Sequence, residues 1–344
     1  AITLLDGLVE CGVQTLTLTG GEPMLHPRFM DIVREIHKRG LTLLDVTTNA
    51  SLVSAQMLDE FSELGVKPKF KVSFDGLGHH DWLRGTDGAE ETTLSAIKLL
   101  TEKGFSVRIQ MNLHKGNLDC VLPTVKFLAE MGIDDIRFMR TTEVPRWQEN
   151  GAGLTLSVEE YYELALELSE KMLFEDINID VTFWQILSYY PKAKSFNIAP
   201  LGFGCGKKYR DSLPTCRAVR GRLAITADGE LFPCNQLSGL MKKRGVSFGN
   251  VKKNSIREII TSGEYLDVAA FTVGERLRYN PKCQTCGHYK NCGGGCPALA
   301  ALLGEGLRGY DPTKCVFFEG GYMEKTTELF ERFGYRLGDL PIDN

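Results

Sequence analysis

The sequence predicts an α/β fold, an open or partial (β/α) barrel followed by a smaller cysteine-rich region. In the first half, short apolar runs rich in β-forming residues alternate with helical patterns, as parallel βαβ units require. In the second half, apolar periodicity fades while eight of the ten cysteines gather between Cys205 and Cys315. A region with so little apolar patterning needs another source of stability, and bound metal would supply it.

Five strands are predicted in the first half, at 15–20, 41–49, 69–76, 105–112 and 133–140. Helical patterns separate them, at 27–39, from near Ser54, from near Glu90 and at 118–131. A helical pattern also opens the chain at 1–12, and we expect a strand before it. Counting that missing first strand gives a partial (β/α)6 TIM barrel. We therefore expect Ala1 to be a cut edge of the chain and not the true N-terminus. A doubly wound sheet is the alternative, because periodicity does not separate the two.

The second half carries fewer regular elements. A long helix begins at Ser157, whose spacing to Glu160 is typical of a capping box. Residues 222–234 alternate around an Asp-Gly turn and predict a hairpin, and one short helix is expected from Asn254. We expect three parts, namely the barrel at 1–195, the cysteine-rich domain at 196–320 and a C-terminal helix or tail at 321–344.

Composition excludes several classes of protein. The 344 residues are 43% hydrophobic, which is enough for real cores, and the net charge of −4 offers no basic field for nucleic acid. No apolar run is long enough to cross a membrane, and the start lacks a signal-peptide pattern. We therefore expect a cytoplasmic protein that binds neither nucleic acid nor membrane.

The stretch "GGEP", residues 20–23, lies between a predicted strand and a helix, where barrel enzymes build their active sites. Gly20 and Gly21 would let a ligand approach the backbone, Glu22 offers a carboxylate to an ammonium group, and Pro23 fixes the exit. Other strand ends are polar as well: Thr48, Asn49, Ser73, Asp75, Arg84 and Asn112. Together they predict a polar ligand with ammonium, carboxylate and ribose-like hydroxyl groups.

The clustered cysteines predict a metal site. Cys216 and Cys234 flank the predicted hairpin, and a CX2CX5CX3C run from Cys283 to Cys296 is followed by Cys315. With Cys205 this makes eight thiols, enough for two four-thiolate sites, and the spacing favours metal over disulfides. Spacing alone leaves iron–sulfur clusters and zinc both open. Cys11 and Cys120 lie in apolar patterns and are expected to be buried, inert thiols.

GGEP, the "SFDG" at 73–76 and the pattern CX12GX4C before CX2CX5CX3C and a last cysteine resemble a radical S-adenosylmethionine (SAM) enzyme with a C-terminal SPASM domain. The resemblance covers the whole chain. It implies a partial TIM barrel that binds SAM through the strand-end residues above, and two auxiliary [4Fe–4S] clusters. One cluster would be held by Cys283, Cys286, Cys292 and Cys315. The other would be held by Cys216, Cys234, Cys296 and, as candidate fourth ligand, Cys205.

The family's CxxxCxxC, which holds the SAM-cleaving cluster, is absent from these residues. We expect it in the full-length protein, with a third [4Fe–4S] cluster, and expect this chain alone to be inactive. The resemblance further implies a reducing electron donor of the flavodoxin or ferredoxin type, and a 5′-deoxyadenosyl radical that abstracts substrate hydrogen. No catalytic side chain can be named.

Three substrate classes compete. The family implies first the maturation of a ribosomally synthesised peptide. A formylglycine-forming, anaerobic sulfatase-maturating activity is the second, but those enzymes carry an Asp base directly after the hairpin cysteine, where this chain has Asn235. Tailoring of a small molecule, as in haem-pathway members, is the third. A metal-stabilised binding module without catalysis would leave GGEP and SFDG without a role.

Overall fold

The computed structural model describes residues 2–141, 145–201, 208, 210–216 and 221–338. The chain divides into two compact units. The first comprises Ala1–Phe196 with Leu329–Arg336, and the second comprises Asn197–Glu328 with Leu337–Asn344. In the part of the chain just given, none of the helices combines the length and apolar character needed to cross a membrane.

The first unit is built on a sheet whose strands follow the order of the chain. Among the described residues, six strands pair in parallel, each with the next: β1 (Thr15–Leu18), β2 (Thr42–Thr48), β3 (Lys69–Ser73), β4 (Val107–Leu113), β5 (Asp135–Arg140) and β6 (Asp180–Phe183). The predicted α/β class is confirmed. Because the order never reverses, the sheet is of the barrel type, and the doubly wound alternative is wrong.

Strand β6 was not predicted from the sequence. It is only four residues long and directly follows a long helix, so its apolar residues read as part of a mixed segment. After β6 the chain turns back: β7 (Leu187–Tyr190) pairs antiparallel with β6, and β8 (Ser195–Ile198) and β11 (Arg336–Leu337) continue the sheet. The ring of Phe330 stacks on that of Phe196, with centroids 4.8 Å apart, which packs the end of the C-terminal helix in this unit.

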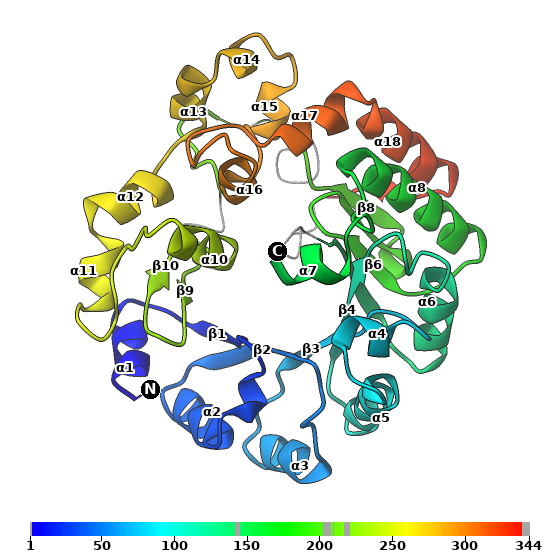
Figure 1. The fold of residues 1–344 in the computed structure, drawn as a ribbon, viewed down its shortest axis with the longest axis vertical. Helices are drawn as coiled ribbons and strands as arrows, with labels where there is room; N and C mark the ends of the chain where they lie inside the picture. The colour runs from blue at the N-terminus through cyan, green and yellow to red at the C-terminus, as the bar shows by residue number, and fades with distance from the viewer. Residues whose placement is uncertain (1, 142–144, 202–207, 209, 217–220, 339–344) are drawn as a thin grey trace. The chain divides into compact units, whose positions relative to one another are not determined.

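Helices fill the connections between the parallel strands and lie on the outer face of the sheet (Figure 1). Phe61 of one such helix is completely buried and meets Phe70 and Phe105 edge-on, at 5.9 and 6.1 Å between ring centroids. The predicted helix start near Ser54 and the predicted capping box at Ser157 are confirmed. The helical elements of this unit are α1 (Ile2–Glu10), η1 (Pro23–Leu25), α2 (Phe29–Lys38), α3 (Ala55–Glu63), α4 (His80–Arg84), α5 (Ala89–Glu102), α6 (Val121–Glu130), α7 (Pro145–Asn150), α8 (Val158–Phe174) and η2 (Pro191–Ala193).

The second unit begins its described regular structure with the predicted hairpin. Strands β9 (Ala224–Ile225) and β10 (Leu231–Phe232) pair antiparallel around the Asp228-Gly229 turn. The single helix expected from Asn254 is wrong, because Ser255 and Ser262 each cap a separate short helix. Short helices make up most of this unit: α10 (Asn235–Lys243), α11 (Ile256–Ile260), α12 (Gly263–Ala269), α13 (Val273–Tyr279), α14 (Pro281–Gln284), α15 (Tyr289–Cys292), α16 (Pro297–Leu302), α17 (Pro312–Glu319) and α18 (Tyr322–Arg332), whose end belongs to the first unit.

Candidate functional site

The GGEP segment forms a polar corner at the carboxyl ends of β1 and β2. The half-buried carboxylate of Glu22 accepts hydrogen bonds from Thr48 Oγ1, at 2.9 Å to each oxygen, and from the amide of Asn49 at 2.8 Å. Gly20 has φ +135°, which only glycine adopts readily, and no atom lies within 4 Å of where a Cβ would stand. The structure therefore brings Glu22, Thr48 and Asn49 together, beside a backbone that a ligand can approach.

A second polar group forms at the ends of β3 and β4. Asp75 is completely buried, and its carboxylate lies 2.6 Å from Nη2 of Arg84 on α4. The backbone amide and the side-chain amide of Asn112 both donate to its Oδ1 at 3.1 Å. Burial acts to raise the pKa of Asp75, but the charges and donors around the carboxylate outweigh it and hold the pKa below its ordinary value.

Two residues that sequence reasoning missed connect these groups. His80 and Thr93 are 1% and 2% exposed. Nε2 of His80 lies 3.2 Å from Oγ1 of Thr93, which donates at 3.4 Å to the carbonyl of Asn49. The other ring nitrogen of His80 accepts the amide of Asp75 at 3.1 Å. The connection joins segments far apart in the sequence, so only the position of a histidine just after SFDG hinted at it.

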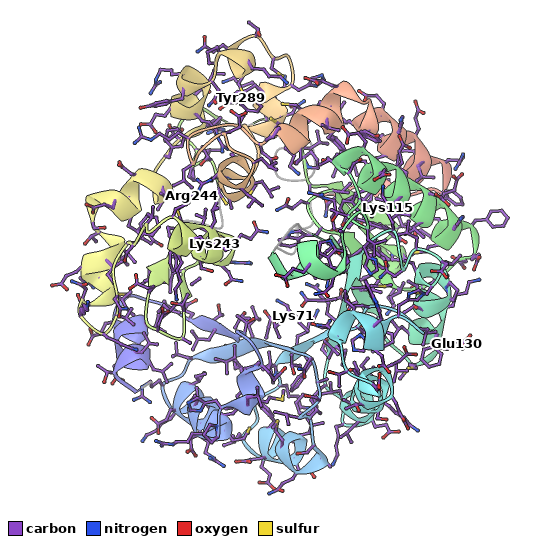
Figure 2. The ribbon with its side chains drawn as sticks, viewed as in Figure 1. Lys71, Lys115, Glu130, Lys243, Arg244 and Tyr289 are labelled. Atoms are coloured by element: carbon purple, nitrogen blue, oxygen red, sulfur yellow. The ribbon has the colours of Figure 1, made fainter. Side chains whose placement is uncertain are left out.

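The sheet face opposite the helices is polar. Phe70 of β3 faces α3, so Lys69, Lys71 and the predicted Ser73 point to the other side. There Lys71 pairs with Asp45 of β2 at 2.8 Å (Lys71 is labelled in Figure 2). Burial lowers the pKa of Lys71, and the Asp45 carboxylate opposes that effect.

The same face continues on β4 and β5 with further charges. Arg108 and Lys69 both contact the carboxylate of Asp135, at 2.7 and 2.9 Å. The guanidinium of Arg137 lies 4.6 Å from the centre of the Trp184 ring. In the strand register, Arg137 pairs with Gln110 and Gln110 with Ser73, so a polar row extends from the predicted site residue Ser73. A face of this kind suits a charged or hydrogen-bonding substrate.

In the second unit, four thiols gather around α14, α15 and α17. Cys283, Cys286 and Cys315 are near enough to Cys292 for their charges to act on its thiol. Burial raises the pKa of Cys292 to about 12 and that of Cys283 to about 11. These are the four cysteines that the family resemblance assigns to one cluster.

A second group of thiols comprises Cys216, Cys234 and Cys296. The charge of Cys216 acts on both of the others, and burial raises the pKa of Cys296 to about 12. Cys205, the candidate fourth ligand, lies outside the described residues. With thiols held protonated by burial, this unit gains its thiolates only when a metal displaces the protons.

The buried side chain of Arg276 indicates whether negatively charged clusters fit the second unit. Arg276 is completely buried, and its Nη2 has no hydrogen-bond partner among the described residues. Cys292 and Cys296 are among the groups whose charges act on this guanidinium. A buried positive charge beside two thiol groups suits clusters that carry net negative charge with their thiolates, so the residues present fit iron–sulfur clusters.

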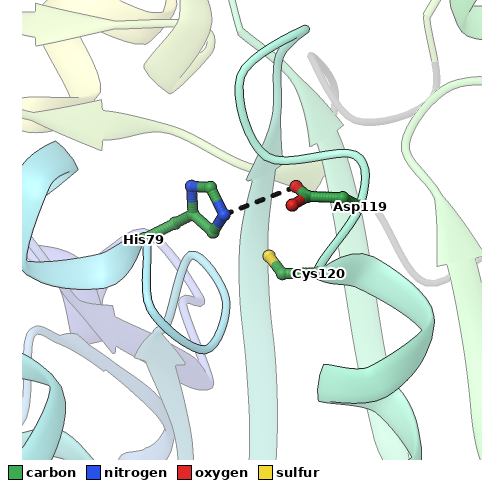
Figure 3. Close-up of side chains that lie close together, drawn as sticks. All are labelled: His79, Asp119 and Cys120. Atoms are coloured by element: carbon green, nitrogen blue, oxygen red, sulfur yellow. Dashed lines mark ion pairs between the residues drawn. The ribbon is translucent and has the colours of Figure 1, made fainter.

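A third group of potential ligands lies in the first unit. One ligand atom each of His79, Asp119 and Cys120 lies within 4.8 Å of the others (Figure 3). The His79 ring is 3.4 Å from the Asp119 carboxylate, and the Cys120 thiol donates to the carbonyl of Asn117. Burial raises the pKa of Cys120 to about 11, so a thiolate is disfavoured, and we assign no metal here. Cys120 is buried as predicted, whereas Cys11 is only half-buried.

The geometry defines an α/β barrel with a polar strand-end site and a domain of clustered, buried thiols. Residues 2–129 match the "Radical SAM superfamily", and residues 216–287 match SPASM, the "Iron-sulfur cluster-binding domain". The chain therefore belongs to the radical SAM enzymes that carry a SPASM domain, and the family predicted from the sequence is confirmed.

Related proteins differ in what they act on. An AdoMet-dependent heme synthase of Methanosarcina barkeri is 26% identical over 92% of this chain and 86% of its own length. A PqqA peptide cyclase of Granulibacter bethesdensis is 21% identical over 100% of this chain and 86% of its own. Streptococcus suis SuiB, solved with S-adenosylmethionine, shares the fold at a TM-score of 0.64 and 17% identity, covering 91% of this chain and 69% of SuiB.

The buried ion pair of Asp75 gives the first testable prediction. Asp75→Asn should destabilise the protein by about 3–5 kcal/mol at pH 7, because it leaves the Arg84 charge without its partner. Since the native pKa of Asp75 is lowered, its stabilisation is complete above the ordinary aspartate pKa of about 4 and is lost as the pH falls through the native value. The difference between wild type and variant in urea unfolding should therefore shrink below about pH 4.

The matched control is Asp87→Asn, because Asp87 is an exposed aspartate of the same region. It should change stability by less than about 0.5 kcal/mol at either pH. A stability loss at Asp75 that persists undiminished in acid would show that the carboxylate charge is not its source.

Proposed function

We propose that this radical SAM enzyme abstracts a hydrogen atom from a peptide substrate. The observation that carries the proposal is the hydrogen-bonded strand-end site that joins Glu22, Asn49 and Asp75 beside a polar sheet face. The relative named as a peptide cyclase, which aligns along the whole chain, supports a peptide as the substrate. A peptide offers amides and charged side chains for Lys71, Arg108 and Arg137 to bind.

SAM would lie against GGEP. Glu22 would hold the ammonium group of SAM, and Thr48 and Asn49 would fix the Glu22 carboxylate by the hydrogen bonds described above. Gly20, Gly21 and Pro23 would shape the adjacent backbone. Ser73 and Asn112 would face the ribose. Arg84 is 28% exposed and paired with Asp75, so it would offer its outer N–H groups to the SAM carboxylate while Asp75 fixes its position. When bound, SAM would supply the radical that removes the substrate hydrogen.

The SPASM unit would hold two auxiliary [4Fe–4S] clusters. Cys283, Cys286, Cys292 and Cys315 would ligate one, and Cys216, Cys234, Cys296 and Cys205 the other. Such clusters accept and donate single electrons, which would let the enzyme oxidise its substrate after hydrogen abstraction. An external reductant of the flavodoxin or ferredoxin type would supply electrons.

A carboxylated small molecule is the second candidate substrate. The heme synthase relative aligns over 92% of this chain, and the polar face includes the largely buried Arg108 and Arg137, a side-chain type that binds carboxylates well. A porphyrin ring with carboxylate side chains would match these cations.

Substrate tests with the anaerobically assembled full-length protein separate these candidates. With SAM and dithionite, we expect 5′-deoxyadenosine together with hydrogen loss from short peptides encoded beside the gene, measured by mass spectrometry. A carboxylated iron porphyrin should leave 5′-deoxyadenosine at its background level. Turnover of the porphyrin with none of the peptides would replace the peptide proposal by the second candidate.

The same assay addresses formylglycine formation. Asn235 follows Cys234 directly and is exposed, but its amide takes up no proton near neutral pH. A cysteine-containing sulfatase peptide should therefore yield no aldehyde. Efficient aldehyde formation would overturn our ordering of the two peptide reactions.

Glu22 provides a direct test of the SAM site. Glu22→Gln should weaken SAM binding by about tenfold or more, since it removes a charge-assisted contact to the ammonium group. Calorimetric titration of SAM would measure the loss, and iron content should not change. Glu63→Gln, at the exposed end of α3, should bind SAM as wild type does. Equal affinity in all three proteins would remove GGEP from the site.

Iron analysis tests the cluster ligands. The 344-residue chain, reconstituted anaerobically, should contain about eight iron and eight sulfide ions, and the full-length protein one further cluster. Cys292→Ala and Cys234→Ala should each remove up to about four iron ions, because each affects a different cluster. Cys120→Ala, a buried thiol of the first unit, should remove none. Zinc in place of iron in anaerobic preparations would contradict the assignment.

A further inference from the structure

Arg276 on α13 is a buried cation in the second unit, and the carboxylate of Asp311 is one of the charges that act on it. The exposed fraction of Arg276 is 0%. Nε donates to the carbonyl of Gly309 and Nη1 to the carbonyl of Gly295, both at 2.7 Å. Nη2 is buried and has no hydrogen-bond partner among the described residues. Burying a guanidinium in this way is costly unless a negative charge lies next to it.

Residues 292–296, which join the two groups of thiols, pack closely against the Arg276 side chain. Gly294, with φ +83°, leaves no room for a Cβ, which would stand 2.6 Å from Cδ of Arg276. The segment begins at Cys292, assigned to one cluster, and ends at Cys296, assigned to the other. Arg276 therefore lies beside the chain that joins the two cluster sites.

The absence of a side chain at Gly295 likewise leaves space for the side chains of Asp311 and Lys314. A Cβ there would stand 2.5 Å from Cβ of Asp311 and 2.8 Å from Cγ of Lys314, which is itself buried. From the sequence, the glycine run suggests close passage of inorganic cores, but at positions 294 and 295 it makes room for protein side chains.

Among the described residues, Asp311 is a carboxylate whose charge acts on both cations. Asp311 is fully buried, and its carboxylate accepts the amides of Thr313 and Cys296 at 3.0 and 3.2 Å. Cys292 and Cys296, the proposed ligands at the two ends of the segment, are also among the groups whose charges act on both cations.

We propose that Arg276 is the shared counter-charge of both auxiliary clusters and raises the reduction potential of each. The inference rests on the proposed cluster ligands. Each cluster takes up one electron and becomes more negative, so a buried cation with a free N–H donor stabilises the reduced state. Because Arg276 lies along the segment from Cys292 to Cys296, removing its charge should lower both potentials together. It acts as a positioning and tuning residue, without contacting substrate.

Redox titration followed by electron paramagnetic resonance tests this on the reconstituted 344-residue chain. In Arg276→Met, the reduced fraction of each cluster at a given potential should fall at least tenfold relative to the oxidised fraction, a shift of about 59 mV. Arg276→Lys keeps the charge and should shift both potentials less. Arg278→Met removes the same charge from the exposed side of the same helix and should leave both nearly unchanged.

The results for these variants either support or overturn the counter-charge role of Arg276. Wild-type potentials in Arg276→Met, with full iron content, would overturn the inference, as would an equal shift in Arg278→Met. If Arg276→Met and Arg276→Gln assemble no clusters but Arg276→Lys does, the charge is required even for assembly, which supports the counter-charge role. Failure of all three variants to assemble would indicate a requirement for side-chain shape and overturn it. A wild-type chain without about eight iron ions would instead refute the cluster assignment itself.

Discussion

The polar edge of the first unit depends on one buried carboxylate. Asp75 stands at the end of β3 with no solvent contact, so its charge must be met by protein groups. Arg84 on α4 and Asn112 on β4 supply the partners. Through His80 and Thr93 the same connection reaches Asn49 on the β2 side. One charge thereby fixes the relative positions of several loops, which is what a site for a multifunctional ligand needs.

In the second unit, buried apolar side chains such as Phe232 and Phe317 lie in the same segments as the thiols. One buried cluster there comprises only Val273, Cys283 and Tyr289, with Leu277 and Tyr310 packed against it. Tyr289 also donates to the carbonyl of Val273 at 2.6 Å (Tyr289 is labelled in Figure 2). The buried Nη2 of Arg276, which has no hydrogen-bond partner among the described residues, makes the metal-free state costly. The proposed clusters would offset that cost, so metal uptake and folding of this unit would be coupled.

Much of the first unit could be predicted because its signals are local. The strands at β1 to β5 are short apolar runs, the capping box at Ser157 is read within four residues, and GGEP follows directly from a strand end. What could not be predicted depends on distant partners. Strand β6 is defined by its pairing with β5, and His80 becomes a connecting residue only because Thr93 and Asn49 meet it in space.

The same distinction holds in the second unit. Cysteine spacing predicted bound metal, and the family resemblance supplied the division of the thiols into two groups. Arg276 carries no such signal: it lies seven residues before the first cysteine of the run and resembles any helical arginine, such as its exposed neighbour Arg278. Its significance comes from its contact with the segment that contains Gly294. In the sequence alone, that glycine run suggested a backbone that passes close to inorganic cores.

The burial of the thiols has a consequence for the protein before any metal arrives. A thiol with a pKa near 12, as at Cys292 and Cys296, is almost entirely protonated at neutral pH, and the thiolate is the form that attacks disulfides and oxidants. Before a metal binds, these two sulfurs are therefore unreactive. Binding of the proposed clusters would release the protons of these two thiols, so it would be slower in acid and faster in mild base. Burial thus protects the sites from premature cross-linking and makes their filling sensitive to the surrounding proton concentration.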